Sequence, residues 1–182
     1  MNTEIEVKFL DIDHDAMREK LRAIGGICEQ PMRLMSRVTI DSPAMSKKNA
    51  FLRVRDEGHR VTMTYKQFDA LSVDGAKEIE VIVEDFDKTV QILQAAGLSF
   101  DSFQESKRET WRVDDVEVVL DEWPWLHSYM EIEAGSEQRL KEVASMLDLD
   151  WSKAVFGDVM VGRTAPNTHT SPKKIQLDVL LK

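Results

Sequence analysis

The chain contains a single cysteine, Cys28, among its 182 residues, which excludes an internal disulfide and a zinc site built from cysteine thiolates. Histidine is also scarce, because His14, His59, His127 and His169 are scattered without the spacing of metal ligands. No apolar run approaches the roughly 20 residues of a membrane-spanning helix, and the start of the sequence lacks a signal-peptide pattern. We therefore expect a cytoplasmic protein that does not engage a membrane.

The sequence also has no excess of positive charge, since its formal net charge is −9. This balance argues against a broad basic surface for nucleic acid, and we expect no nucleic-acid partner. It does not exclude a small polyanion, because a pocket can be locally basic on an acidic protein. The length suits one domain, or one domain with a small appendage.

The opening stretch Glu4-Ile-Glu-Val-Lys8 alternates charged and apolar residues, the period-2 pattern of a strand. A single stretch of this kind is usually a solvated face, whose cross-strand ion pairs contribute under about 1 kcal/mol. Here the pattern recurs in three other strand-like segments, which carry the pairs Arg53 and Arg55, Glu78 and Glu80, and Glu131 and Glu133. The repetition predicts a closed sheet with apolar side chains packed outward against helices and a polar interior for a charged ligand.

The remaining elements follow from periodicity and capping residues. Helices are expected after Asp13, after Asp85 or Asp87, and after Ser136, because each residue can cap a segment with helical apolar spacing. Further strands are expected at about 27–41, 51–57, 60–67, 76–83, 99–113, 116–122 and 129–134. The polar, aperiodic stretch that begins at Gly162 predicts a domain over residues 1–162, followed by a linker and an apolar tail over 163–182.

The charged faces predict a site for a phosphate chain. Carboxylates held close together raise one another's pKa unless a cation lies between them, and Mg²⁺ or Mn²⁺ suits oxygen ligands. Arginine binds phosphate through two parallel hydrogen bonds, and lysine supplies a point charge. The basic residues that could share the interior are Lys8, Arg53, Arg55, Lys66 and Arg108.

The opening stretch resembles the N-terminal ExExK signature of the CYTH superfamily, the triphosphate tunnel metalloenzymes. This group includes class IV adenylate cyclases, thiamine triphosphatases and inorganic triphosphatases. The resemblance spans about residues 1–162 and implies an α+β fold, an eight-stranded antiparallel β-barrel or tunnel with flanking helices. It continues through Leu52-Arg-Val-Arg55, Tyr65-Lys66, Lys77-Glu-Ile-Glu80, Arg108-Glu-Thr-Trp111, Leu120-Asp121 and Glu131-Ile-Glu133.

The resemblance also implies a role for each matched residue. Glu4, Glu6 and Lys8 form the catalytic signature. The triphosphate would be bound by Lys8, Arg53, Arg55, Lys66 and Arg108. The divalent metals would be held by Glu4, Glu6, Glu131 and Glu133, with Glu78, Glu80 and Asp121 lining the acidic side and helping to place a metal or its waters.

Two positions depart from the family pattern. Many members have a basic residue where this chain has Ser106, and the neighbouring Lys107 has the opposite strand parity. Lys153 lies where some members place a functional lysine, although the local match is poor.

The favoured activity is metal-dependent hydrolysis of a triphosphate: inorganic tripolyphosphate, thiamine triphosphate or a nucleoside triphosphate. One alternative is a class IV adenylate cyclase that converts ATP to cyclic AMP and pyrophosphate. Another is a non-catalytic module that binds triphosphate or polyphosphate. The expected partner is a small-molecule triphosphate, and the sequence leaves open both the preferred metal and whether the protein is a homodimer.

Overall fold

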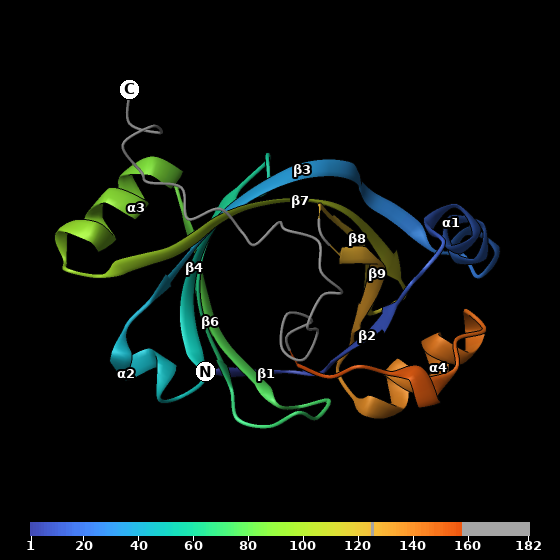
Figure 1. Ribbon diagram of the computed structural model, residues 1–182. Coiled ribbons are helices and arrows are strands. Elements are labelled where there is room, and N and C mark those ends of the chain that lie inside the picture. The colour runs from blue at the N-terminus through green and yellow to red at the C-terminus, as the bar shows by residue number, and fades with distance from the viewer. Residues whose placement is uncertain (125, 158–182) are drawn as a thin grey trace.

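The computed structural model describes residues 1–124 and 126–157, which form a barrel of antiparallel strands with helices outside it (Figure 1). The linker and tail expected over 163–182 lie outside the described residues. The strands are β1 (Asn2–Glu4), β2 (Glu6–Leu10), β3 (Ile27–Asp41), β4 (Ala50–Asp56), β5 (Val61–Phe68), β6 (Ala76–Val83), β7 (Ser99–Val113), β8 (Val116–Trp123) and β9 (Leu126–Glu133). The helices are α1 (His14–Ala23), α2 (Pro43–Ser46), α3 (Phe86–Ala95), α4 (Glu137–Met146) and the short 3₁₀ helix η1 (Trp151–Lys153).

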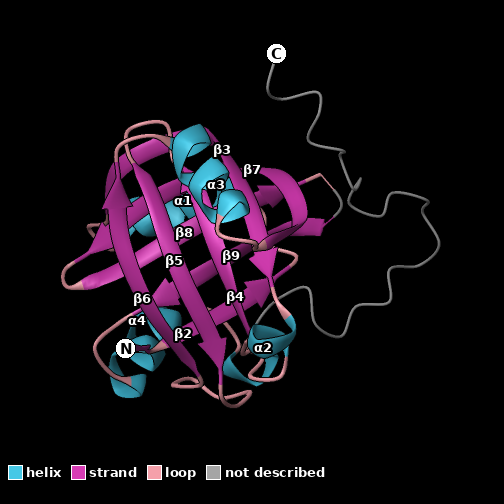
Figure 2. Ribbon diagram, turned by 90° about the vertical axis from the view of Figure 1, so that its left-hand side faces the viewer, coloured by secondary structure: helices cyan, strands magenta, loops and turns pink. Residues whose placement is uncertain are grey.

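The N-terminal segment closes the barrel. The strand order is β1-β6-β5-β4-β3-β7-β8-β9-β2, so the two ends of the sheet are the consecutive strands β1 and β2. They are separated only by Ile5, whose carbonyl oxygen accepts a hydrogen bond from the Ala134 amide at 3.1 Å. The eight-stranded barrel predicted from the sequence is therefore confirmed, with its first strand broken into two. Figure 2 shows the strands from the side of the barrel.

Each predicted helix begins at the expected cap. The Asp13 side chain accepts hydrogen bonds from the amides of Asp15 and Ala16, and Asp85 and Ser136 cap α3 and α4 in the same way. Gly25, directly after the C-cap of α1, has a φ of 83°, a conformation that favours glycine and ends the helix. None of the helices in the described part of the chain is long and apolar enough to cross a membrane.

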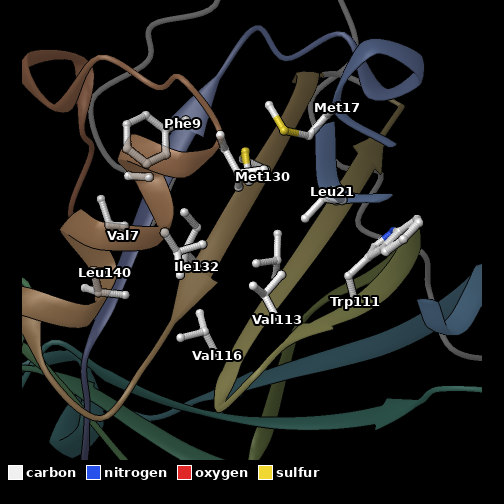
Figure 3. Packing of buried hydrophobic residues seen from close by; sticks show 14 of the residues in the cluster. Val7, Phe9, Met17, Leu21, Trp111, Val113, Val116, Met130, Ile132 and Leu140 are labelled. Atoms are coloured by element: carbon white, nitrogen blue, oxygen red, sulfur yellow. The ribbon is translucent and has the colours of Figure 1, made fainter. Parts of the chain in front are cut away.

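The main apolar core lies outside the barrel wall, between the strands and the helices α1 and α4 (Figure 3). Alternate residues of the strands supply one side of this core, among them Val7 on β2 and Ile132 on β9, both fully buried. Leu21 on α1 and Leu140 on α4 supply the facing side and are also fully buried. Burial of such side chains contributes roughly 1.5–3 kcal/mol each. The apolar faces therefore point outward, as predicted.

A second, smaller core packs α3 on the opposite part of the barrel, where Val90 meets Val38, Ile40 and Val54. The sequence pattern did not predict the short helix α2, which lies between the strands expected at 27–41 and 51–57. Ser42 caps it by accepting a hydrogen bond from the Met45 amide, with Pro43 at its first position. Four residues are too few to show helical periodicity.

Candidate active site

Strand β2 is buried on both faces, which separates it from an ordinary surface strand. Val7 and Phe9 pack into the outer core, whereas Glu6 and Lys8, 3% and 5% exposed, point into the barrel. Charged side chains are almost never buried to this degree unless they are paired or functional. The polar interior predicted from the alternating pattern is therefore present.

The barrel interior contains a cavity of about 250 Å³. All the predicted site residues except Asp121 line this cavity, so side chains from seven strands meet there. They are Glu4, Glu6, Lys8, Arg53, Arg55, Lys66, Glu78, Glu80, Arg108, Glu131 and Glu133.

Two lysines lie among the carboxylates. The Lys8 ammonium is 2.7 Å from Glu6 Oε1 and 3.0 Å from Glu131 Oε2. The Lys66 ammonium is 2.6 Å from Glu4 Oε2 and 3.4 Å from Glu6 Oε2. Burial opposes the charge on Lys8, but Glu131 and Glu6 outweigh it and raise the lysine's pKa. Burial likewise raises the pKa of Glu131, and Lys8 and other cations outweigh that effect and lower it.

Nearby cations only partly stabilise the charged form of two other carboxyl groups, those of Glu133 and Glu78. Burial, followed by the negative charges of Glu4 and Glu131, raises the pKa of Glu133 to about 8. Burial and the charge of Glu4 raise the pKa of Glu78 to about 7. Both groups therefore hold a proton more tightly than an ordinary carboxyl, because the lysines of the cavity do not fully compensate burial and the neighbouring carboxylates.

The acidic residues fit a hard divalent cation by their chemistry. They offer carboxylate oxygens, which Mg²⁺ and Mn²⁺ prefer, and an added cation would relieve the repulsion around Glu133 and Glu78. Within residues 1–124 and 126–157, no three acidic, histidine or cysteine side chains are already arranged to hold a metal ion. Lys8 and Lys66 lie between the carboxylates instead, so ligation would require these ammonium groups to move.

Arginines dominate the other part of the cavity. The Arg53 guanidinium donates to Thr64 Oγ1 at 3.2 Å and lies 3.6 Å from Glu80 Oε2. Burial, followed by the positive charges of Arg53 and Arg108, lowers the pKa of Arg55 to about 9. An arginine destabilised by its neighbours to this degree is a favourable place for an anion.

Asp121 occupies a different place from the other acidic residues. It is 1% exposed, and both of its carboxylate oxygens contact the Arg108 guanidinium, at 2.8 and 2.6 Å. Arg108 itself lines the cavity. The geometry therefore pairs Asp121 with Arg108, the residue for which the family resemblance implies phosphate binding.

Like charges face each other across neighbouring strands. Glu6 pairs in register with Glu133, and Arg37 pairs with Arg55. Such pairs destabilise a sheet, because cross-strand neighbours of equal charge repel. These like-charged pairs occur beside opposite-charge contacts such as that of Lys8 with Glu131, and their cost in stability is typical of a functional site. The arrangement suits a ligand that combines cations with a polyanion.

The sequence analysis did not select several residues that line the cavity. Arg37 donates to Gln104 Oε1 at 2.7 Å, and its guanidinium carbon lies 4.3 Å from the centre of the Trp123 ring. The alternation of side chains along a strand could have indicated Arg37. It lies four residues after Arg33 in the strand expected at 27–41, so the two arginines share one face of that strand. Arg60 and Glu117 also line the cavity without having been selected.

The two positions that depart from the family pattern, Ser106 and Lys153, lie in different surroundings. Ser106 lines the cavity, so a hydroxyl stands there instead of the usual basic group. Lys107 points elsewhere, and its ammonium lies 3.8 Å from Glu122 Oε2 near the surface. Lys153 is exposed on η1 and is not among the lining residues of the cavity.

Comparison with known proteins identifies the fold. The family model described as CYTH domain matches residues 2–150. No curated protein sequence matches the chain significantly. The PH1012 protein from Pyrococcus horikoshii OT3 has a similar structure, with 19% identity, a TM-score of 0.72, and coverage of 83% of this chain and 93% of its own.

Two further similar structures carry functional descriptions. A candidate adenylate cyclase from Vibrio parahaemolyticus has 15% identity and a TM-score of 0.75, and the match covers 87% of this chain and 96% of that chain. HpAC1 from Hippeastrum, an adenylyl cyclase candidate with a dominant triphosphatase activity, has 15% identity and a TM-score of 0.60. That match covers 86% of this chain and 91% of that one. At these identities the likeness concerns the fold.

Proposed function

The chain belongs to the CYTH domain family, and from this membership we propose that it is a metal-dependent phosphohydrolase that cleaves a triphosphate inside the barrel. The observation that carries the proposal is the presence of like-charged pairs on the inner face, with Glu6 facing Glu133 and Arg37 facing Arg55. A triphosphate with a divalent cation would satisfy both groups of charges at once.

The carboxylates would form the metal-binding part of the site. A bound Mg²⁺ or Mn²⁺ would polarise phosphoryl oxygens and make a bound water more acidic. The ligands would come from Glu4, Glu6, Glu131 and Glu133, while Glu78 and Glu80 would orient waters in the same region.

The lysines would change partners when the ligand binds. Lys8 and Lys66 now neutralise Glu4, Glu6 and Glu131. With a polyanion in the cavity, both ammonium groups can turn toward phosphate oxygens and release the carboxylates. Both lysines would thus support turnover without leaving the barrel interior.

The arginines would bind and orient the phosphate chain. Arg53, Arg55 and Arg108 come from two different strands and line one cavity, so they would contact phosphoryl groups from two sides. Arginine–phosphate hydrogen bonds would stabilise the charge that develops on the transferred phosphoryl group. Water is the proposed nucleophile, because the sequence contains no recognisable purine-binding motif that would favour cyclisation of ATP.

The direct test is a phosphate-release assay with tripolyphosphate, thiamine triphosphate and ATP, with Mg²⁺ and with Mn²⁺, together with a cyclic AMP measurement. Metal-dependent phosphate release from at least one triphosphate is expected. Cyclic AMP as the dominant product would overturn hydrolysis in favour of the cyclase. Tight triphosphate binding without turnover with either metal would instead indicate a binding module.

A further inference from the structure

The barrel interior continues beyond the proposed active site into a second cavity of about 460 Å³. Both cavities are lined by Arg55, Arg60, Arg108 and Glu117, so they meet at these residues. The lining of the second cavity also includes Arg33 and Glu57, which the first cavity lacks. A phosphate chain that extended past Arg55 and Arg108 in this direction would therefore enter the second cavity.

A buried carboxylate stands in this cavity. Glu57 directly follows β4 and is 2% exposed. Its oxygens lie 2.9 Å from Arg55 Nη2, 3.0 Å from Arg60 Nε and 3.9 Å from Arg33 Nη2. The Glu57 amide also donates to the Arg60 carbonyl oxygen at 2.9 Å, which fixes the turn that carries the side chain.

Three guanidinium groups share this one carboxylate. In the described part of the chain, no other carboxylate lies within ion-pair distance of Arg33, Arg55 or Arg60. The Arg55 and Arg33 Nε atoms are buried without a hydrogen-bond acceptor among the described residues. Glu57 thus takes the position that a phosphoryl group would take among arginines, while two positive charges remain uncompensated.

We propose that Glu57 is a specificity-determining residue, whose carboxylate occupies the arginine cluster of the second cavity and so limits the length of the phosphate chain that the barrel accepts. The inference rests on the proposed function, because it concerns the ligand of the same interior. A triphosphate would occupy the first cavity, and a further phosphoryl group would meet Glu57.

The physical basis is repulsion between a phosphoryl group and the buried carboxylate of Glu57. A fourth phosphoryl group would have to displace Glu57 from its arginines or remain close to an unneutralised carboxylate, and both are costly. An uncharged side chain at this position would leave all three arginines available to the phosphate. The limit on chain length should then disappear while the first cavity is unchanged.

The test compares the affinities of tripolyphosphate and of a longer linear polyphosphate, measured by calorimetry with divalent metal chelated. The variants are Glu57→Gln and, as a matched control, Glu109→Gln. Glu109 is likewise a buried carboxylate bound by an arginine, Arg18, but it lies outside both cavities. In E57Q the ratio of long-chain to tripolyphosphate affinity should rise at least about tenfold, equivalent to about 1.4 kcal/mol.

The control should keep the wild-type ratio. In E57Q the affinity for tripolyphosphate should rise less than the affinity for the longer polyphosphate, because Arg33 lines only the second cavity whereas Arg55 and Arg60 line both. An unchanged ratio in E57Q would overturn the inference. If E57Q does not fold, Glu57→Ala replaces it with the same expected result, and thermal unfolding verifies the fold of each variant.

Binding without metal separates this inference from the proposed activity. If the wild-type protein binds tripolyphosphate but hydrolyses no triphosphate, the proposed function fails while the affinity ratio still decides the role of Glu57. If the wild-type protein binds no polyphosphate either without metal or with Mg²⁺ or Mn²⁺, both fail.

Discussion

Arg108 and Asp121 face each other in register across β7 and β8, and the carboxylate engages the guanidinium through two contacts of 2.8 and 2.6 Å. Such a bidentate pair fixes the plane of the guanidinium group. Because Arg108 lines the cavity and Asp121 is almost completely buried, the pair presents a positioned donor to the interior. The sequence suggested instead that Asp121 helps to place a metal.

Asp121→Asn distinguishes these two roles. If Asp121 orients Arg108, the KM for the triphosphate should rise about tenfold, the effect of losing roughly 1.4 kcal/mol of binding. The metal concentration required for half-maximal activity should stay near the wild-type value. A large increase in that metal requirement with an unchanged KM would identify Asp121 as part of the metal site.

Glu133→Gln should abolish turnover while the protein remains folded, and Glu4→Gln should do the same. Since burial and neighbouring carboxylates raise the pKa of Glu133, removing its charge should leave the Tm without metal unchanged or higher. The increase in Tm that Mg²⁺ or Mn²⁺ gives the wild-type protein should shrink in E133Q, because metal affinity contributes to folded-state stability.

Glu84→Gln is the matched control for this prediction. Glu84 is an exposed carboxylate just after β6, so its loss should change neither turnover nor the response of the Tm to metal. Near-normal turnover in E133Q or E4Q would show that the proposed metal ligands are wrong.

Arg53→Ala should mainly weaken triphosphate binding. Arg53 is buried on the cavity wall and has only partial compensation from Glu80, 3.6 Å away. We expect the KM to rise about tenfold or more, since a charge-assisted hydrogen bond contributes about 1.5–3 kcal/mol. Arg22→Ala, on the exposed side of α1, should keep wild-type kinetics. An unchanged KM with full kcat in R53A would count against its role.

Glu57 should also make stability depend on acid pH. Burial opposes its ionisation, but Arg55 and Arg60 outweigh burial and lower the pKa of Glu57 below its ordinary value of 4.5. For a carboxyl with a lowered pKa, the stabilisation is complete above the unfolded-state pKa and is lost as pH falls through the folded-state pKa.

The measurement is the free energy of unfolding by denaturant between pH 3 and pH 7 for wild type and E57Q. The difference between the two proteins should be greatest at neutral pH and should shrink as the solution is acidified. A difference that stays constant over this range would show that Glu57 is not more acidic in the folded protein.

Much of the barrel could be predicted from the sequence because its two faces follow simple rules. Alternation placed Glu6 and Lys8 on the inner face opposite Val7, and capping side chains located the starts of α1, α3 and α4. The break at Ile5 was not predictable, since its cause is the pairing of one short segment with two distant strands, β6 and β9.

The internal partners of the site residues were less predictable. Strand alternation places Lys8, Glu6 and Glu131 on the inner face of the barrel. It does not show that the Lys8 ammonium lies between the carboxylates of Glu6 and Glu131. Glu57 shares the parity of Arg53 and Arg55 in the expected strand 51–57, so alternation places it on their face, but it does not show that the carboxylate contacts both Arg55 and Arg60. Such contacts depend on the curvature of the closed sheet.

The split first strand links the assembly of the site to the order of synthesis. The segment that bears Glu4, Glu6 and Lys8 is synthesised before the other strands of the barrel, yet β2 pairs with β9, the last described strand. Pairings between such distant segments form slowly, because a long intervening chain must be ordered first. Until β9 exists, the N-terminal acidic residues have no Glu131 or Glu133 beside them. The proposed arrangement of acidic residues can therefore arise only in a molecule in which β9 has been made and docked.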